Sequence, residues 1–280
     1  MSIRIYNGPH SDRGGGGGPS WPARLPLVFA LITVGLQIVW PLASGGGRVT
    51  LTLLIVTAFF LASLTHAWQT RGRWWTVAWA VISLAFGLGV EVLGTRTGVP
   101  FGSYSYAPEV LGPTVAGIPA IIPMAWAMMS YPALLVGRRL GRSGLATVLI
   151  AGWALASWDL FLDPQMVGEG YWAWASPAPE MPGVPGIPAL NYLGWLVAAI
   201  VLMTLLNRLP DAEMAGRRQG GPGRRRLPEG VPGGLYLWTW VGGIVANAFF
   251  LGRPSVAIVG GIAMGLVAVP YALRLTERQP

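Results

Sequence analysis

Three carboxylates, Glu91, Asp159 and Asp163, lie inside or at the edge of stretches that are otherwise apolar. Ionisable groups at membrane depth are costly and by default mark a functional site. Asp159 and Asp163 are four residues apart, which puts both carboxylates on one face of a helix. In a cluster of carboxylates one member can hold a proton and act as an acid, while another acts as a base. The sequence therefore predicts a functional site at these three residues, and acid–base chemistry is one use that it could have.

A structural role is the alternative for two of them. Glu91 and Asp163 lie near predicted helix ends, where a single carboxylate often anchors the helix at the interface or caps a loop. Asp159 lies farther from any loop signal, and a charge there needs a partner or a proton. Two asparagines, Asn191 and Asn247, are expected at the same depth as the carboxylates.

The elements that carry these residues are predicted to be membrane-spanning helices. The chain has 280 residues, of which 53% are hydrophobic and 11% charged, so it is too apolar for a soluble domain. The expected fold is an all-α, polytopic membrane helix bundle with seven or eight transmembrane helices. The apolar runs that predict them are Leu25–Ala43, Val49–Trp68, Trp74–Leu93, Gly117–Val136, Gly144–Leu162, Ala189–Leu206, Leu235–Leu251 and Val256–Leu273.

Arginine positions predict the orientation of this bundle. Sixteen of the nineteen arginines fall in the termini and in one set of connections, and only Arg48, Arg96 and Arg253 fall in the other set. The positive-inside rule then makes both termini cytoplasmic in a multi-pass protein of a bacterial or archaeal cell membrane. This topology places the three carboxylates together near the extracytoplasmic helix ends.

The domain organisation follows from the same pattern. We expect a disordered Gly-rich tail over residues 1–23 and a single transmembrane domain over residues 24–275. A cytoplasmic Gly/Arg loop over residues 209–233 is interpreted as a contact with lipid headgroups, with no nucleic-acid partner.

The outer connections 94–116 and 164–188 are rich in Gly, Pro and aromatic residues and are predicted to form a structured lid over a pocket. Other tryptophans, Trp195 among them, are expected in the interfacial belt. The residues expected to bind substrate are Phe101, Tyr104, Tyr106, Trp126, Trp158, Trp172, Trp174 and Asn191.

Several kinds of chemistry are excluded by composition. The chain has no lysine for a Schiff base and no cysteine for a thiolate, and its two histidines are too few for a histidine-based metal centre. We therefore expect no thiolate or histidine metal centre, and carboxylates, aromatic rings and water must carry most of the chemistry.

A series of motifs between about residues 85 and 200 resembles a known family. The motifs are Glu91-x-x-Gly94, Gly98-Val99-Pro100-Phe101-Gly102-x-Tyr104-x-Tyr106, Leu111-Gly112-Pro113, Ile118-Pro119, Pro123-x-x-Trp126, Asp159-Leu160-x-Leu162-Asp163-Pro164-x-Met166, Trp172-x-Trp174 and Gly186-Ile187-Pro188-x-x-Asn191-Tyr192-x-Gly194-Trp195. Their order and spacing resemble the membrane carotenoid-biosynthesis proteins that include carotenoid 1,2-hydratases, of the γ-carotene 1'-hydroxylase and bisanhydrobacterioruberin hydratase types.

The resemblance implies cofactor-free addition of water to the terminal C1–C2 double bond of an acyclic carotenoid end group, which gives a tertiary alcohol. Lycopene, γ-carotene and C50 carotenoids are the candidate substrates, and membrane lipid and other enzymes of the pathway are candidate partners. Asp159 is then the expected proton donor, with Asp163 or Glu91 as the base or as its charged neighbour. Asn191 and Tyr104 would orient the water, and indole faces would stabilise the carbocation.

Two other functions remain open at this point. Asp159-x-x-x-Asp163 also resembles half of the magnesium–diphosphate motif of membrane prenyltransferases, including carotenoid elongases, although the sequence has no second motif of this kind and the predicted side of the membrane is wrong. A non-enzymatic proton or ion carrier would use the carboxylates as a relay. However, no acidic or histidine chain continues towards the cytoplasmic half.

Overall fold

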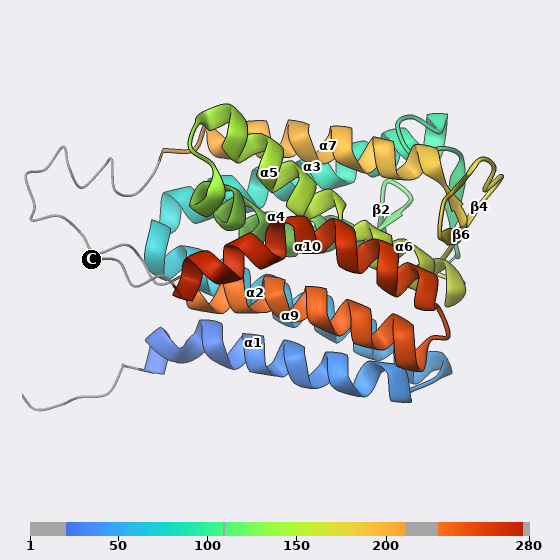
Figure 1. Cartoon of the computed structure of the whole chain (residues 1–280), viewed down its shortest axis with the longest axis horizontal. Coiled ribbons are helices and arrows are strands. Elements are labelled where there is room, and N and C mark those ends of the chain that lie inside the picture. Colours follow the sequence, from blue (N-terminus) through green and yellow to red (C-terminus); the bar gives the residue numbers. More distant parts are fainter. Residues whose placement is uncertain (1–20, 109, 211–228, 277–280) are drawn as a thin grey trace, which may run out of the picture.

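The helices run side by side along the long axis of the molecule (Figure 1). The computed structural model describes residues 21–108, 110–210 and 229–276. The short strands gather at one end of the bundle, which we call the site end. The start of α1 and the end of α10 both lie at the opposite end, as expected when the chain crosses the bundle an even number of times.

Eight helical rods make up the described part of the bundle, and they confirm the predicted all-α, polytopic membrane fold. By length and composition, six of the rods can cross a membrane: α1 with η1, α2, α3, α5 with α6, α7 and α10. The helices are α1 (Trp21–Val39), η1 (Trp40–Leu42), α2 (Gly45–Arg71), α3 (Arg73–Thr97), α4 (Ile121–Leu140), α5 (Gly144–Ala156), α6 (Asp159–Gly168), α7 (Ala189–Asn207), α9 (Gly230–Val245), the π-helix η2 (Ala246–Phe250) and α10 (Pro254–Thr276).

The remaining two rods are shorter or less apolar. Helix α9 has 16 residues before it continues into η2. Helix α4 ends in Arg138 and Arg139, but most of its other residues are buried. It packs against α2, α3, α5, α9 and α10, which makes it the central helix of the bundle. A helix that is buried nearly all round is surrounded by other helices rather than by lipid.

Several predicted boundaries are wrong by about one turn. The fourth predicted span starts at Gly117, whereas α4 starts at Ile121 because the two residues Ile118–Pro119 form a strand instead. The fifth predicted span is interrupted at Ser157 and Trp158, and the helix then continues as α6 to Gly168, beyond Leu162. The two connections at the site end therefore cover residues 98–120 and 169–188.

These connections contain three antiparallel two-stranded sheets. β1 (Tyr104–Tyr106) pairs with β4 (Trp172–Trp174), so this sheet joins the two connections to each other. β2 (Thr114–Val115) pairs with β3 (Ile118–Pro119), and β5 (Glu180–Met181) pairs with β6 (Val184–Pro188). The β1–β4 register sets Tyr104 opposite Trp174 and Tyr106 opposite Trp172.

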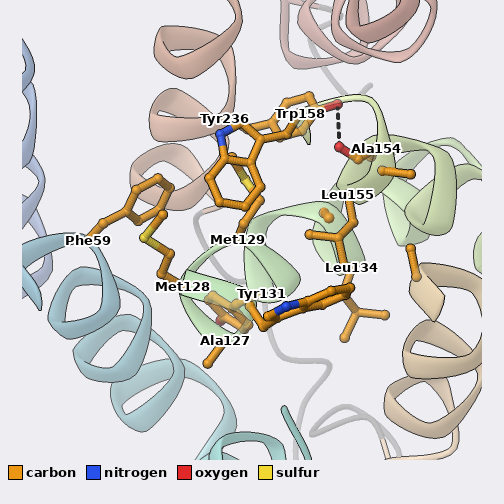
Figure 2. Close-up of a cluster of buried hydrophobic side chains, with 14 of the residues drawn as sticks. Phe59, Ala127, Met128, Met129, Tyr131, Leu134, Ala154, Leu155, Trp158 and Tyr236 are labelled. Carbon is orange, nitrogen blue, oxygen red and sulfur yellow. Dashed lines mark hydrogen bonds between the residues drawn. The ribbon is translucent and has the colours of Figure 1, made fainter. Parts of the chain in front are cut away.

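The core lies where α2, α4, α5 and α9 meet. Figure 2 shows Phe59 beside Met128 and Met129, with Trp158 and Tyr236 nearby. The Tyr236 hydroxyl donates to the Ala154 carbonyl at 3.4 Å. On another side of α4, Gly137 lets α5 approach so closely that an added Cβ would lie 2.5 Å from the Thr147 carbonyl oxygen. Small residues allow such close approach of helices in membranes.

Two predicted segments fall mostly outside the described residues. Of the predicted tail 1–23, residues 1–20 lie outside, and Trp21–Ala23 belong to α1. Of the predicted Gly/Arg loop 209–233, residues 211–228 lie outside, and α9 already begins at Gly230. The cytoplasmic assignment of the termini stays a prediction.

Candidate functional site

Glu91 lies in the last two turns of α3, and its side chain is only 4% exposed. Three neutral groups donate hydrogen bonds to its carboxylate. The Tyr104 and Tyr106 hydroxyls donate to Oε2, at 2.7 Å for Tyr106, and the Trp126 indole N–H donates to Oε1 at 2.9 Å. Gly94, one turn along α3, makes room for this arrangement, because an added Cβ would lie 2.9 Å from the Tyr104 hydroxyl.

Asp159 and Asp163 form a second carboxylate group on α6, and each is 1% exposed. The side-chain amide of Asn191, in the first turn of α7, donates to both of them, at 2.8 Å to Asp159 Oδ2 and 2.7 Å to Asp163 Oδ2. The second oxygen of Asp163 accepts from the indole N–H groups of Trp172, at 2.6 Å, and Trp174, at 3.3 Å. Asp159 begins α6, where the helix dipole favours negative charge.

The β1–β4 sheet connects the two carboxylate groups. Side chains two residues apart on a strand point to the same face. Tyr104 and Tyr106 of β1 both donate to Glu91, while Trp172 and Trp174 of β4 both donate to Asp163. The rings also contact each other across the strands, with centroids 5.0 Å apart for Tyr104 and Trp174. One small sheet thus positions four donors over two of the three carboxylates, Glu91 and Asp163.

Burial and the neighbouring Glu91 carboxylate raise the pKa of Tyr104 and of Tyr106 above the usual value for a phenol. Both hydroxyls therefore keep their protons and act as donors. In the described part of the chain, no arginine hydrogen-bonds to the three carboxylates, and no group of three or more His, Asp or Glu side chains is arranged to hold a metal ion. Among the described residues, the groups that donate hydrogen bonds to these carboxylates are all neutral.

Stacked tryptophans form the wall beside Glu91. Trp126 and Trp195 stack with centroids 4.1 Å apart and an interplanar angle of 2°. Trp158 meets Trp195 edge to face at 6.2 Å, and Phe101 packs against Trp195 at 6.1 Å. The expectation that Trp195 belongs to the interfacial belt is wrong, since it is only 8% exposed. Its position one helical turn after Asn191 is the sequence signal that points to the site.

A small polar cavity of about 30 Å³ lies between the two carboxylate groups. One water needs roughly 10 to 15 Å³ of such volume and two to four polar partners. Glu91, Asp163, Asn191 and Tyr104 provide polar atoms in its wall. The cavity therefore has the size and the lining for one or two water molecules.

A second cavity of about 400 Å³ adjoins the same residues and is lined mostly by apolar side chains, chiefly of α1, α2, α4, α6 and α9. Its volume is in the usual range for a small-molecule site. Glu91, Tyr106, Trp172 and Trp195 line both cavities. Asp163 lines only the small cavity, and Asp159 lines neither.

The structure thus brings together all the residues that the sequence proposed for the site. Asn247 does not join them, because its amide donates to the Gly243 carbonyl in its own helix, at 2.9 Å. A family profile described as "Carotenoid biosynthesis protein" matches residues 47–268, which include the three carboxylates and every residue of both cavities after η1. The chain belongs to this family.

One curated relative of this carotenoid biosynthesis protein is the bisanhydrobacterioruberin hydratase of Haloarcula japonica. The two are 33% identical over 110 residues, a segment that covers 35% of each chain. The match therefore spans about a third of the relative's length. No solved structure matches the chain.

Proposed function

We propose that this carotenoid biosynthesis protein is a cofactor-free hydratase. It adds water to the terminal C1–C2 double bond of an acyclic carotenoid end group and produces a tertiary alcohol. The observation that carries the proposal is the junction of the two cavities at Glu91: one is apolar and suits a polyene end, and the other is polar and has room for water. The partial match to a bisanhydrobacterioruberin hydratase supports the same reaction class.

Glu91 is the proposed proton donor because it is the carboxyl group that lines both cavities. A general acid must reach the atom that it protonates. The O–H bond of Glu91 breaks as the π electrons of the double bond form a C2–H bond, which leaves a tertiary carbocation at C1. The Tyr104, Tyr106 and Trp126 donors then stabilise the carboxylate charge as it develops, as in an oxyanion hole.

Water from the small cavity attacks C1 while the cation exists. Asp163, which lines that cavity, takes the proton that the attacking water releases. The indole faces of Trp126 and Trp195 lie beside Glu91, and cation–π attraction of about 0.5 to 2 kcal/mol would stabilise the carbocation there. Return of the proton from Asp163 to Glu91 through the small cavity completes a cycle in which alkene and water give alcohol.

Asp159 has a positioning role in this proposal. It was the donor expected from the sequence, but it lines neither cavity and shares the Asn191 amide with Asp163. Two carboxylates held by one amide influence each other's charge. Asp159 therefore tunes the basicity of Asp163 rather than contacting the substrate.

The test is expression in hosts that make lycopene, γ-carotene or C50 carotenoids, followed by mass spectrometry of the pigments. The parent chain should add one or two waters, and growth in ¹⁸O-labelled water should label the new hydroxyl groups. Glu91→Gln and Asp163→Asn should abolish the product. Glu180→Gln is the matched control, because Glu180 is exposed and lines neither cavity. Unchanged pigments in all three hosts would refute the hydratase.

A further inference from the structure

The large cavity has one exposed side. Four of its lining side chains are also among the exposed apolar side chains of the bundle: Ile38, 54% exposed, Val241, 45%, Val245, 41%, and Phe250, 53%. Ile38 lies near the end of α1, and the other three lie on α9 and η2. The lining residues from α2, α4 and α6 are buried or only partly exposed. The opening therefore lies between α1 and α9–η2.

The wall of α9 is unusually thin at this opening. Gly242 and Gly243 line the cavity between Trp238 and Ala246, so two consecutive positions have no side chain. One turn earlier, the Trp238 indole N–H donates to Gln37 Oε1 on α1 at 2.8 Å, and both residues line the cavity. This hydrogen bond joins the two helices at the edge of the opening.

The site end is more polar than this opening. There the β1–β4 sheet covers the carboxylates, and its four aromatic side chains are all engaged in hydrogen bonds to Glu91 or Asp163. The exposed residues of the opening are apolar, and Ile38 belongs to a rod that is long and apolar enough to cross a membrane, so lipid chains are the expected neighbours of this side. An apolar ligand dissolved in the bilayer meets the opening directly.

We propose that the gap between α1 and α9–η2 is a lateral portal through which the end of an acyclic polyene enters from the bilayer, while the rest of the molecule stays in lipid. The identity of this occupant rests on the proposed function. The hydrocarbon core of a bilayer is about 30 Å thick, so a long polyene lies within it alongside the portal. The Gln37–Trp238 hydrogen bond holds the portal at one edge.

A matched pair of glycine variants tests the portal. Gly242→Leu adds a bulky side chain to the wall of the large cavity, which Gly242 lines. The backbone can accept this side chain, because the nearest atom to the added Cβ would be 3.7 Å away, in Trp238. Gly234→Leu makes the same change on the same helix at an exposed position with nothing within 4 Å, away from the cavity. Purified proteins in lipid vesicles are mixed with lycopene-loaded vesicles, and polyene entry is followed by quenching of tryptophan emission.

Entry should slow by about tenfold or more in Gly242→Leu, because filling a largely preformed pocket removes the space for the ligand. Gly234→Leu should behave like the parent chain. A second test uses single cysteines, since the chain has none of its own. A bulky maleimide attached to folded Val245→Cys should block entry, whereas the same label on Phe249→Cys should not, because Phe249 is 79% exposed and does not line the cavity.

Parent-like quenching in both Gly242→Leu and labelled Val245→Cys would overturn the portal. The quenching signal does not depend on turnover, so the two proposals fail separately. If the parent chain binds polyene without hydrating it and the two portal variants block binding, the portal stands and the hydratase falls. If the parent hydrates polyene and the portal variants do so at the parent rate, the hydratase stands and the portal falls.

Discussion

Replacing Tyr106 with Phe removes one of the three donors to Glu91 and keeps the aromatic ring. The lost hydrogen bond is 2.7 Å long, and the bonds from Tyr104 and Trp126 remain. Hydrogen bonds to charged groups contribute about 1.5 to 3 kcal/mol. If this energy acts on charge that develops only in the transition state, kcat falls by roughly 10- to 150-fold, since 1.4 kcal/mol is a factor of ten.

KM should change little in Tyr106→Phe, because the phenyl group still presents a ring to the large cavity that Tyr106 lines. The assay is the initial rate of lycopene hydration by purified protein in lipid vesicles, at several lycopene contents. Tyr236→Phe is the control: it removes the hydroxyl of a fully buried tyrosine elsewhere in the bundle, which donates to the Ala154 carbonyl at 3.4 Å. A Tyr106→Phe protein that keeps kcat within about threefold of the parent would refute the role given to these donors.

Two further predictions concern stability. Gly137→Ala should lower the thermal midpoint in detergent, because its Cβ would lie 2.5 Å from the Thr147 carbonyl oxygen and overpacking costs about 1 to 3 kcal/mol. Gly89→Ala is the control and should leave the midpoint unchanged, since nothing lies within 4 Å of its added Cβ. Equal midpoints for the two variants would contradict the close packing of α4 on α5. Burial and Glu91 raise the pKa of Tyr104 and Tyr106, so the stability from their protonated forms is complete below the usual phenol value of about 10 and is lost as the pH rises above it. In a variant with Phe at both positions, the thermal midpoint should fall less steeply as the pH rises above about 10 than it does in the parent chain. An equal slope in both proteins would contradict the role given to these hydroxyls.

Much of the bundle is predictable because apolar length and spacing are local properties of the sequence. The eight predicted spans correspond to the eight rods. Counting how often the chain crosses the bundle predicts that the three carboxylates lie at the same end of it. The spacing of Asp159 and Asp163 correctly predicts a common face, since both bond to Asn191. These inferences need only helix geometry.

The parts that the sequence does not reveal depend on contacts between distant segments. No local pattern pairs residues 104–106 with residues 172–174, so which donors reach which carboxylate is visible only in the structure. The stacking of Trp195 on Trp126 joins α7 to α4 in the same way. The break before Asp159 and the strand at Ile118 are likewise small departures from an apolar run that reads as continuous helix.

The pairing of β1 with β4 makes the chemistry of the site a matter of strand register. Side chains alternate faces along a strand, so a slip of one residue turns every ring to the opposite face. Here such a slip would point Ser105 and Ala173 at the carboxylates in place of four ring donors. A single-residue insertion beside either strand would therefore leave all three acids in position and yet turn that strand's two ring donors away from Glu91 or from Asp163, while the bonds from Trp126 and Asn191 remain.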